Sequence, residues 1–337
     1  MDMNNGFDII KDQKFTDLEA QKKAYEKERD HVNAREVCRE ICDYLSDTLG
    51  PDHPDTLDYR VKLAFSYQRC REREEARRMM DEIHKRKCEL FGELSPAAVR
   101  TFCAKAQLYN VEDDEDVFFD IEAEAHRQIG CILESDDIDV MYALYNYAYV
   151  MNEYYGHSAL SVYEEIRDWT LKHRGAESHE YLSAVSELCD VYYELEFYDE
   201  AIEVGEEYYA HLLKKHGSDD EYVLMACENL AKVYFFNGDY SEAQRYLDTY
   251  VAVYERREGS EEKLLEAYYN MSLCAYLNKD TEAAKSRSEK MYELLNTSIN
   301  EENPLRNEAL SLYQKMQSEK KSPFFFLRWH DVWGKLL

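Results

Sequence analysis

Apolar residues along positions 218–259 recur at the spacing of two amphipathic helices. Ser218 followed by Glu221 is typical of a capping box at the start of the first helix, Gly238 is typical of its end, and Asp239 of the N-cap of the second. The apolar positions of the first helix are Leu224, Leu230, Ala231 and Tyr234, and those of the second are Ala243, Tyr246, Leu247, Tyr250, Val251 and Tyr254. This segment is therefore predicted to be a helical hairpin that closes near Gly259.

The same pattern returns with a period of about forty-two residues, which indicates a repeat array. Two independent series of landmarks keep this period. We expect a small residue at the alanine position because the two helices of each hairpin cross there. The series are Gly50, Gly92, Gly175, Gly217 and Gly259, and Ala34, Ala76, Ala201, Ala243 and Ala284.

The period predicts an all-α solenoid of about seven antiparallel helical hairpins. Four units are clearly marked, whereas the unit that begins the array and the two units between 93 and 175 are diverged. No segment shows the sustained alternation expected of strands. The predicted organisation is an N-terminal extension over 1–14, the array over 15–300, a terminal helix within 301–321 and a separate tail over 322–337.

The order of leucine, small residue, tyrosine, glycine or aspartate, tyrosine and alanine in these units resembles the tetratricopeptide repeat. The segment TLGPDHPDTL, from Thr48 to Leu57, is similar to the interrepeat signature of the kinesin light chain subtype. Pro54 would take the first helical position, where its missing amide does no harm. The resemblance covers about 15–300 and implies a right-handed superhelical solenoid whose concave groove is lined by the first helix of each hairpin. It implies fold more than function.

Composition predicts the cellular compartment and argues against a nucleic-acid partner. Nine cysteines without a CxxC pair favour a reducing compartment, and neither a signal-peptide pattern nor a run of eighteen apolar residues occurs, so we predict a cytoplasmic protein. The 29 tyrosines suit thin layers in which a ring packs while its hydroxyl reaches a polar partner. A net charge of −29 argues against nucleic-acid binding, although the acidic excess is also what a solvated outer face would show.

Catalytic chemistry leaves no signature, so we predict no enzyme, no metal and no cofactor. The sequence lacks GxSxG, GxxxxGK[ST], HExxH and CxxC motifs. Cys38 and Cys42, one helical turn apart, are read as buried small hydrophobes rather than half of a metal site. Histidines near 173–216 mostly flank helix ends, where exposed histidine is ordinary.

The predicted binding surface lies on the first helices. In the resembled family the residue before the leucine often contacts a bound peptide, and here that position holds Asn146, Glu187, Asn229 and Asn270. A carboxamide can pair with a peptide backbone; solvated or packing polar residues are the equally weighted alternative. Neighbouring positions expected in an open groove are Asp190, Tyr193, Met225, Lys232, Phe236, Tyr269 and Leu273. With few lysines and arginines among aromatic and acidic residues, this groove favours a ligand with basic and apolar side chains.

The function predicted from this pattern is a non-enzymatic scaffold or adaptor that binds a peptide or partner protein. The alternative is a ligand-sensing regulator whose superhelical pitch changes when a short peptide binds, since each unit of a solenoid contacts only its neighbours. An enzyme of unrecognised type is a third, weaker hypothesis.

The tail differs from all that precedes it. Phe325, Phe326, Trp329 and Trp333 fall on one side at helical spacing, and four basic residues accompany two acidic ones between Glu319 and Leu337. Such an apolar stripe needs a partner. It could cap the last repeat, insert into another subunit's groove or a partner protein and so support self-association, or, as the weakest case, meet a membrane surface.

Overall fold

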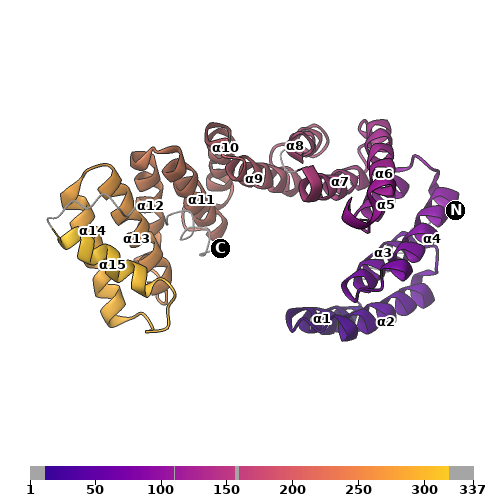
Figure 1. The fold of residues 1–337 in the computed structure, drawn as a ribbon, viewed down its shortest axis with the longest axis horizontal. Helices are drawn as coiled ribbons and strands as arrows, with labels where there is room; N and C mark the ends of the chain where they lie inside the picture. The colour runs from indigo at the N-terminus through magenta and orange to yellow at the C-terminus, as the bar shows by residue number, and fades with distance from the viewer. Residues whose placement is uncertain (1–11, 110, 156–158, 319–337) are drawn as a thin grey trace. The chain divides into compact units, whose positions relative to one another are not determined.

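The computed structural model describes residues 12–109, 111–155 and 159–318, and within them it consists of fifteen α-helices without a β-strand (Figure 1). Contacts divide the chain into two compact units, Met1–Gly175 and Ala176–Leu337. Unit 1 holds α1 (Gln13–Lys27), α2 (His31–Leu49), α3 (Pro54–Arg69), α4 (Arg73–Phe91), α5 (Pro96–Ala106), α6 (Val111–Ile132), α7 (Asp139–Tyr155) and α8 (Leu160–Arg174). Unit 2 holds α9 (His179–Glu194), α10 (Tyr198–His216), α11 (Glu221–Asn237), α12 (Tyr240–Tyr254), α13 (Glu261–Leu277), α14 (Thr281–Thr297) and α15 (Arg306–Gln317).

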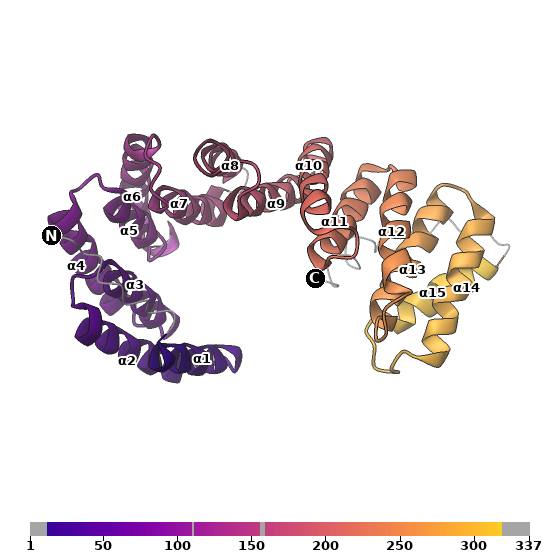
Figure 2. The same ribbon diagram turned by 180° about the vertical axis from the view of Figure 1, so that it is seen from behind.

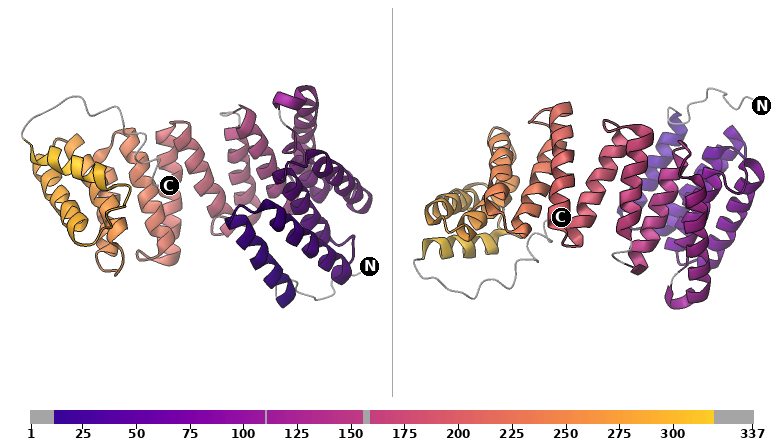
Figure 3. Two further views of the ribbon diagram at one scale, coloured as in Figure 1. Left: turned by 60° about the horizontal axis from the view of Figure 1, so that its bottom comes forward. Right: turned by 90° about the horizontal axis from the view of Figure 1, so that it is seen from above.

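Successive helices pair into hairpins, and hairpins stack on one another within each unit. The first and second helices of a hairpin pack together, as α3 does with α4 and α11 with α12, and a second helix then contacts the first helix of the next hairpin, as α10 does with α11 (Figure 3). The described helices form seven hairpins followed by α15. The prediction of an all-α array of seven hairpins with one further helix is confirmed.

Local signals at the helix ends are mostly where the sequence placed them. Gly238 adopts the left-handed conformation that ends α11, and the Asp239 carboxylate accepts a hydrogen bond from the amide of Glu242 at 3.2 Å. The predicted capping box at Ser218 is wrong. Asp220 caps α11 instead, accepting from the Tyr222 amide at 2.9 Å, while the Ser218 hydroxyl donates to Asp219 at 3.2 Å.

Small residues lie at the helix crossings, as the period predicts. The alanines of the repeated series are buried, with exposed fractions between 0 and 5 %, because a larger side chain there would push the two helices apart. Cys38 and Cys42 are buried in the core of unit 1 as well. All nine cysteines are free thiols.

Tyrosine hydroxyls join neighbouring helices through carboxylates. Tyr181 donates to Glu207 at 2.6 Å, and Tyr234 donates to Glu206 at 2.6 Å. The rings are largely enclosed while the hydroxyl groups reach charged acceptors, which makes these hydrogen bonds stronger than neutral ones. The high tyrosine content therefore serves the junctions between layers.

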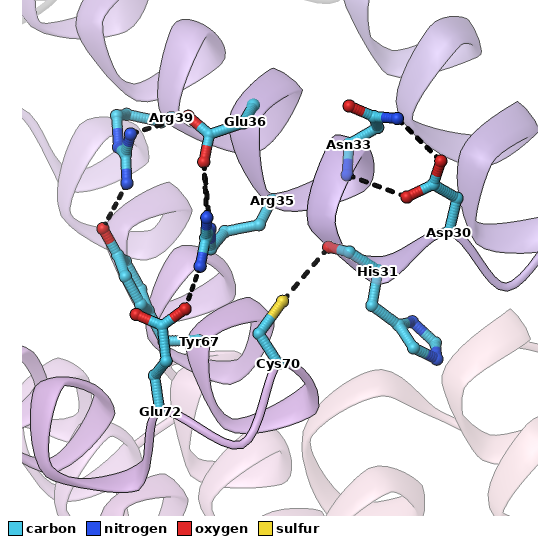
Figure 4. A network of polar contacts seen from close by, with 9 residues as sticks. All are labelled: Asp30, His31, Asn33, Arg35, Glu36, Arg39, Tyr67, Cys70 and Glu72. Atoms are coloured by element: carbon cyan, nitrogen blue, oxygen red, sulfur yellow. Dashed lines mark hydrogen bonds and ion pairs between the residues drawn. The ribbon is translucent and has the colours of Figure 1, made fainter.

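Arginines make a comparable junction between the first two hairpins of unit 1 (Figure 4). Arg35 on α2 bonds to Glu72 at the start of α4, and Arg39 donates to the Tyr67 hydroxyl of α3 at 2.6 Å. The Cys70 thiol donates to the backbone carbonyl of His31 at 3.3 Å. These contacts hold the turn after α3 against α2.

The third hairpin is irregular. α5 spans only eleven residues, and it packs directly against α7 as well as against its own partner α6. Among the described helices, no other pair of successive first helices packs as extensively as α5 and α7. The weak repeat pattern between 93 and 133 therefore corresponds to altered packing rather than to a missing unit.

Candidate functional site

The predicted binding residues lie on the first helices α7, α9, α11 and α13. On α7, the Asn146 side chain is taken up within unit 1. Its Oδ1 accepts from Gln107 at 3.0 Å, and its Nδ2 donates to the Arg100 carbonyl at 3.2 Å. Asn146 therefore ties α7 to α5 and the residue that follows it, in agreement with the packing interpretation of this asparagine.

Residues of α9 and α11 come together in unit 2. The Lys232 ammonium lies 4.1 Å from the centroid of the Tyr193 ring, and the Phe236 ring meets the Tyr193 ring edge-on with centroids 5.5 Å apart. Tyr198, from α10, stacks on Phe236 at 6.3 Å. We call this surface the α9–α11 face and define it by Asp190, Tyr193, Tyr222, Met225, Glu228, Lys232 and Phe236.

Large apolar side chains are exposed at one end of the α9–α11 face. Met225 is 54 % exposed and Tyr222 is 60 % exposed. They lie three residues apart on α11, so both point to the same side. Met225 was predicted as a groove residue and Tyr222 was not, although its i, i+3 spacing to Met225 places it on the same side of the helix.

The other two predicted residues on α9 and α11 differ in burial. Glu187 is exposed on α9, whereas Asn229 is half-buried on α11. Both belong to the surface of unit 2 next to the α9–α11 face, and their role in a peptide ladder stays a prediction.

On α13 the expectation of an open groove is wrong. Tyr269, Asn270 and Leu273 are only 3 %, 7 % and 0 % exposed. α15 packs against α13 and α14 (Figure 2), and its Lys315 ammonium lies 4.7 Å from the centroid of the Tyr276 ring of α13. α13, the first helix of the last hairpin, is thus covered by α15.

Unit 1 carries a pocket of different chemistry on its first helices. Its volume is about 640 Å³, and basic side chains contribute much of its wall. Lys62 lies over the Tyr59 ring at 4.4 Å, and Arg69 pairs with Glu26 at 3.2 Å. The first helices of this unit are therefore more basic than the groove positions predicted on α9, α11 and α13. The pocket is lined by Lys22, Glu26, Lys62, Phe65, Ser66, Gln68, Arg69, Gln107 and Tyr149.

Two features are absent from the described part of the chain. Within it, no group of three histidine, cysteine, aspartate or glutamate side chains is placed to hold a metal ion. No helix there is both long and apolar enough to cross a bilayer. The predicted tail residues Phe325, Phe326, Trp329 and Trp333 lie outside the described residues.

Family models match two stretches of the chain. Both are described as tetratricopeptide repeats, and they cover residues 56–97 and 180–256, one in each unit. The chain contains tetratricopeptide repeats in these two stretches. The matched stretches contain the hairpins in which the sequence pattern is clearest, and they confirm the resemblance on which the fold was predicted. No curated protein matches the sequence.

Solved structures that are similar to this chain have low sequence identity to it. A Signal Transduction ATPase with Numerous Domains from Pyrococcus horikoshii, which has a tetratricopeptide repeat sensor, is 15 % identical and has a TM-score of 0.50. The match covers 88 % of this chain and 43 % of the ATPase chain. A Podosopora anserina protein with kinesin light chain nearly identical TPR-like repeats is 19 % identical (TM-score 0.44; 72 % and 96 % covered). BtubC from P. vanneervenii is 18 % identical (TM-score 0.46; 72 % and 94 % covered).

Carboxylates near the α9–α11 face are held in a partly desolvated environment. Desolvation raises the pKa of Asp190, and it lowers the pKa of Lys232, where Asp190 and Glu194 act in the opposite direction. On α13, desolvation and then repulsion from Glu228 raise the pKa of Glu266 to about 7. The charges of Asp190, Glu228 and Glu266 are therefore incompletely solvated in the folded protein.

The raised pKa of Glu266 makes stability depend on pH. Its charged neighbours are Glu228 on α11 and Glu262 and Lys263 on α13; Lys263 lowers the pKa and the others raise it. An unfolded glutamate has a pKa of about 4.3, so the folded state retains the proton more strongly. The contribution of protonated Glu266 to the stability of the folded state is fully present below about pH 4.3, and it is lost as the pH rises through about 7.

We therefore expect Glu266→Gln to raise the free energy of unfolding at pH 8 by about 1–3 kcal/mol and to change it little at pH 5. Glutamine keeps the shape of the protonated carboxyl without its charge. Urea denaturation at both pH values measures the difference. Glu289→Gln, on the exposed surface of α14, is the control and should change the free energy of unfolding by less than about 0.5 kcal/mol. An effect of Glu266→Gln that is equal at pH 5 and pH 8 would contradict the raised pKa.

Proposed function

We propose that this protein is an interaction scaffold that binds a peptide or partner protein on the α9–α11 face of unit 2. Tetratricopeptide repeats mediate protein–protein interaction through the surfaces that their stacked helices create. The observation that carries the proposal is the exposure of Tyr222 and Met225, at 60 % and 54 %. Exposed apolar side chains grouped beside aromatic rings are typical of a binding surface.

The charges of the face favour a ligand with basic and apolar side chains. Asp190 and Glu228 flank the aromatic residues, Glu187 and Glu194 are exposed on α9, and Lys232 is the basic residue of the face. A basic side chain of the ligand would neutralise carboxylates that are already partly desolvated. An apolar side chain next to it would cover Met225 and Tyr222.

The proposed setting is the cytoplasm, or another reducing compartment, because the nine cysteines are all free thiols. Six of them are buried and behave as small hydrophobes. Their oxidation would require the helices that enclose them to separate.

The proposal is tested with immobilised peptides in which arginine or lysine alternates with apolar residues, and with matched peptides that carry glutamate instead. A chain that ends at Ser318 retains all fifteen described helices and presents the α9–α11 face without the tail. It should prefer the basic peptides. Tyr222→Ala combined with Met225→Ala should weaken this binding at least about tenfold, since a few central residues carry most of the affinity of an interface.

The matched control is Phe197→Ala with Leu213→Ala, which removes two apolar side chains that are also exposed in unit 2. These replacements should leave peptide binding unchanged. Undiminished binding by the folded Tyr222/Met225 variant, or a preference for the acidic peptides, would rule out the α9–α11 face as the site.

A further inference from the structure

We propose that residues 322–337 bind to the α9–α11 face of their own chain, so that the protein carries a ligand for its own binding surface. The inference rests on the function proposed above, because it names an occupant for the same face. It follows from what α15 covers, from what the α9–α11 face leaves exposed and from the chemistry of the segment that follows Ser318.

The end of the repeat array already has its cap. Ala309, Leu312 and Met316 of α15 are 0 %, 1 % and 5 % exposed, and Tyr313 stacks on Tyr292 of α14 with ring centroids 4.2 Å apart. The apolar face of α15 thus fills the role that a terminal unit of a solenoid requires. The apolar stripe of residues 322–337 is therefore not needed at this position and is left to bind elsewhere.

The α9–α11 face complements that stripe in its apolar surface and in its charge. Met225 and Tyr222 present exposed apolar surface, and Tyr193 and Phe236 add ring edges against which phenylalanine and tryptophan pack favourably. Between Glu319 and Leu337, four basic residues accompany two acidic ones. The basic side chains would meet Asp190 and Glu228. Desolvation raises the pKa values of both carboxyl groups, and a nearby cation would stabilise their ionised form.

The segment can reach this face within unit 2. α15 packs on α13 and α14, α13 packs on α12, and α12 packs on α11. Packed helices lie about 8–10 Å apart, so the three packing steps from α15 to α11 amount to about 24–30 Å. The eleven residues from Ser318 to Trp329 can span roughly 36 Å. A segment tethered so close to its site has an effective concentration of about a millimolar. Even a modest intrinsic affinity would therefore keep the face occupied.

The test uses a fluorescently labelled synthetic peptide of residues 319–337 and compares the full chain with the chain that ends at Ser318. By fluorescence anisotropy, the shortened chain should bind the peptide at least about tenfold more tightly, because in the full chain the tethered segment competes for the face. Circular dichroism should show that the shortened chain stays folded, since α15 remains in place, and the full chain should melt at the higher temperature, because the bound segment stabilises the folded state. Tyr222→Ala with Met225→Ala in the shortened chain should abolish peptide binding, and Phe197→Ala with Leu213→Ala should not.

Several outcomes would overturn the inference. Equal affinity of the full and shortened chains, or no binding to the shortened chain, would show that the segment does not occupy the face. Concentration-dependent dimers of the full chain that disappear on shortening, seen by sedimentation, would assign the segment to a second copy instead. If the shortened chain binds the immobilised basic peptides at this face but not the 319–337 peptide, the inference fails while the proposed function stands. If it binds neither, both fail.

Discussion

Replacing Asp58 by alanine is expected to lower the free energy of unfolding by about 3–5 kcal/mol. Lys87 on α4 is only 2 % exposed, and its ammonium lies 2.6 Å from the Asp58 carboxylate on α3. The other Asp58 oxygen pairs with Arg100 of α5 at 3.0 Å, and Arg100 pairs in turn with Asp139 of α7 at 2.7 Å. Without Asp58, the buried ammonium of Lys87 loses its counter-ion, and leaving a buried charge unpaired is strongly destabilising. Urea denaturation at neutral pH measures the loss.

The reverse replacement should be much milder. In Lys87→Met the carboxylate of Asp58 is partly exposed and keeps Arg100 as a partner, and methionine fills the space of the lysine stem. Combining Lys87→Met with Asp58→Ala should recover most of the stability, because no unpaired buried charge remains. A loss below about 1 kcal/mol for Asp58→Ala, the size expected of an exposed pair, or no recovery in the double variant, would contradict this account.

The regular hairpins could be predicted because their signals are local. Gly238 and Asp239 mark a helix end and a helix start through backbone conformation and capping, which neighbouring residues determine. The corresponding turns of four other hairpins use Arg29, Arg71, Glu196 and Lys279, with φ between 59 and 65°. A non-glycine residue in the left-handed region leaves no recognisable mark in the sequence, because the packing of the two helices imposes its conformation.

The candidate site could be predicted only where it depends on helical spacing. Asp190, Tyr193, Lys232 and Phe236 gather on one face because α9 and α11 repeat the same pattern on neighbouring first helices. The burial of Tyr269, Asn270 and Leu273 depends on how α15 docks, which no local pattern states.

The division of the chain into two units could not be predicted from the sequence either. Gly175 closes a unit just as Gly50 and Gly92 do, and it has a similar positive φ. Nothing in the repeat pattern therefore distinguishes the point at which contacts divide the chain into two units.

Two glycines within helices should respond in opposite directions to a larger side chain. Gly205 is buried in α10, where a Cβ atom would lie 2.9 Å from Leu230 Cδ2 and 3.2 Å from Cys189 Sγ. Leucine at this position would add three more carbons between α9 and α11, so Gly205→Leu is expected to lower the free energy of unfolding by about 2–3 kcal/mol. Urea denaturation of the variant against the parent chain measures the change.

Gly130→Ala is the matched replacement on α6. Gly130 is exposed, and a Cβ atom there would meet nothing within 4 Å. Alanine should therefore raise the free energy of unfolding by about 0.5–1 kcal/mol, because it restricts the unfolded chain and favours the helix. The pair separates the intrinsic cost of glycine in a helix from the close approach of helices at Gly205. If both replacements stabilised the protein, α10 would not lie as close to Leu230 and Cys189 as this packing requires, and the register of the fifth hairpin would have to be redrawn.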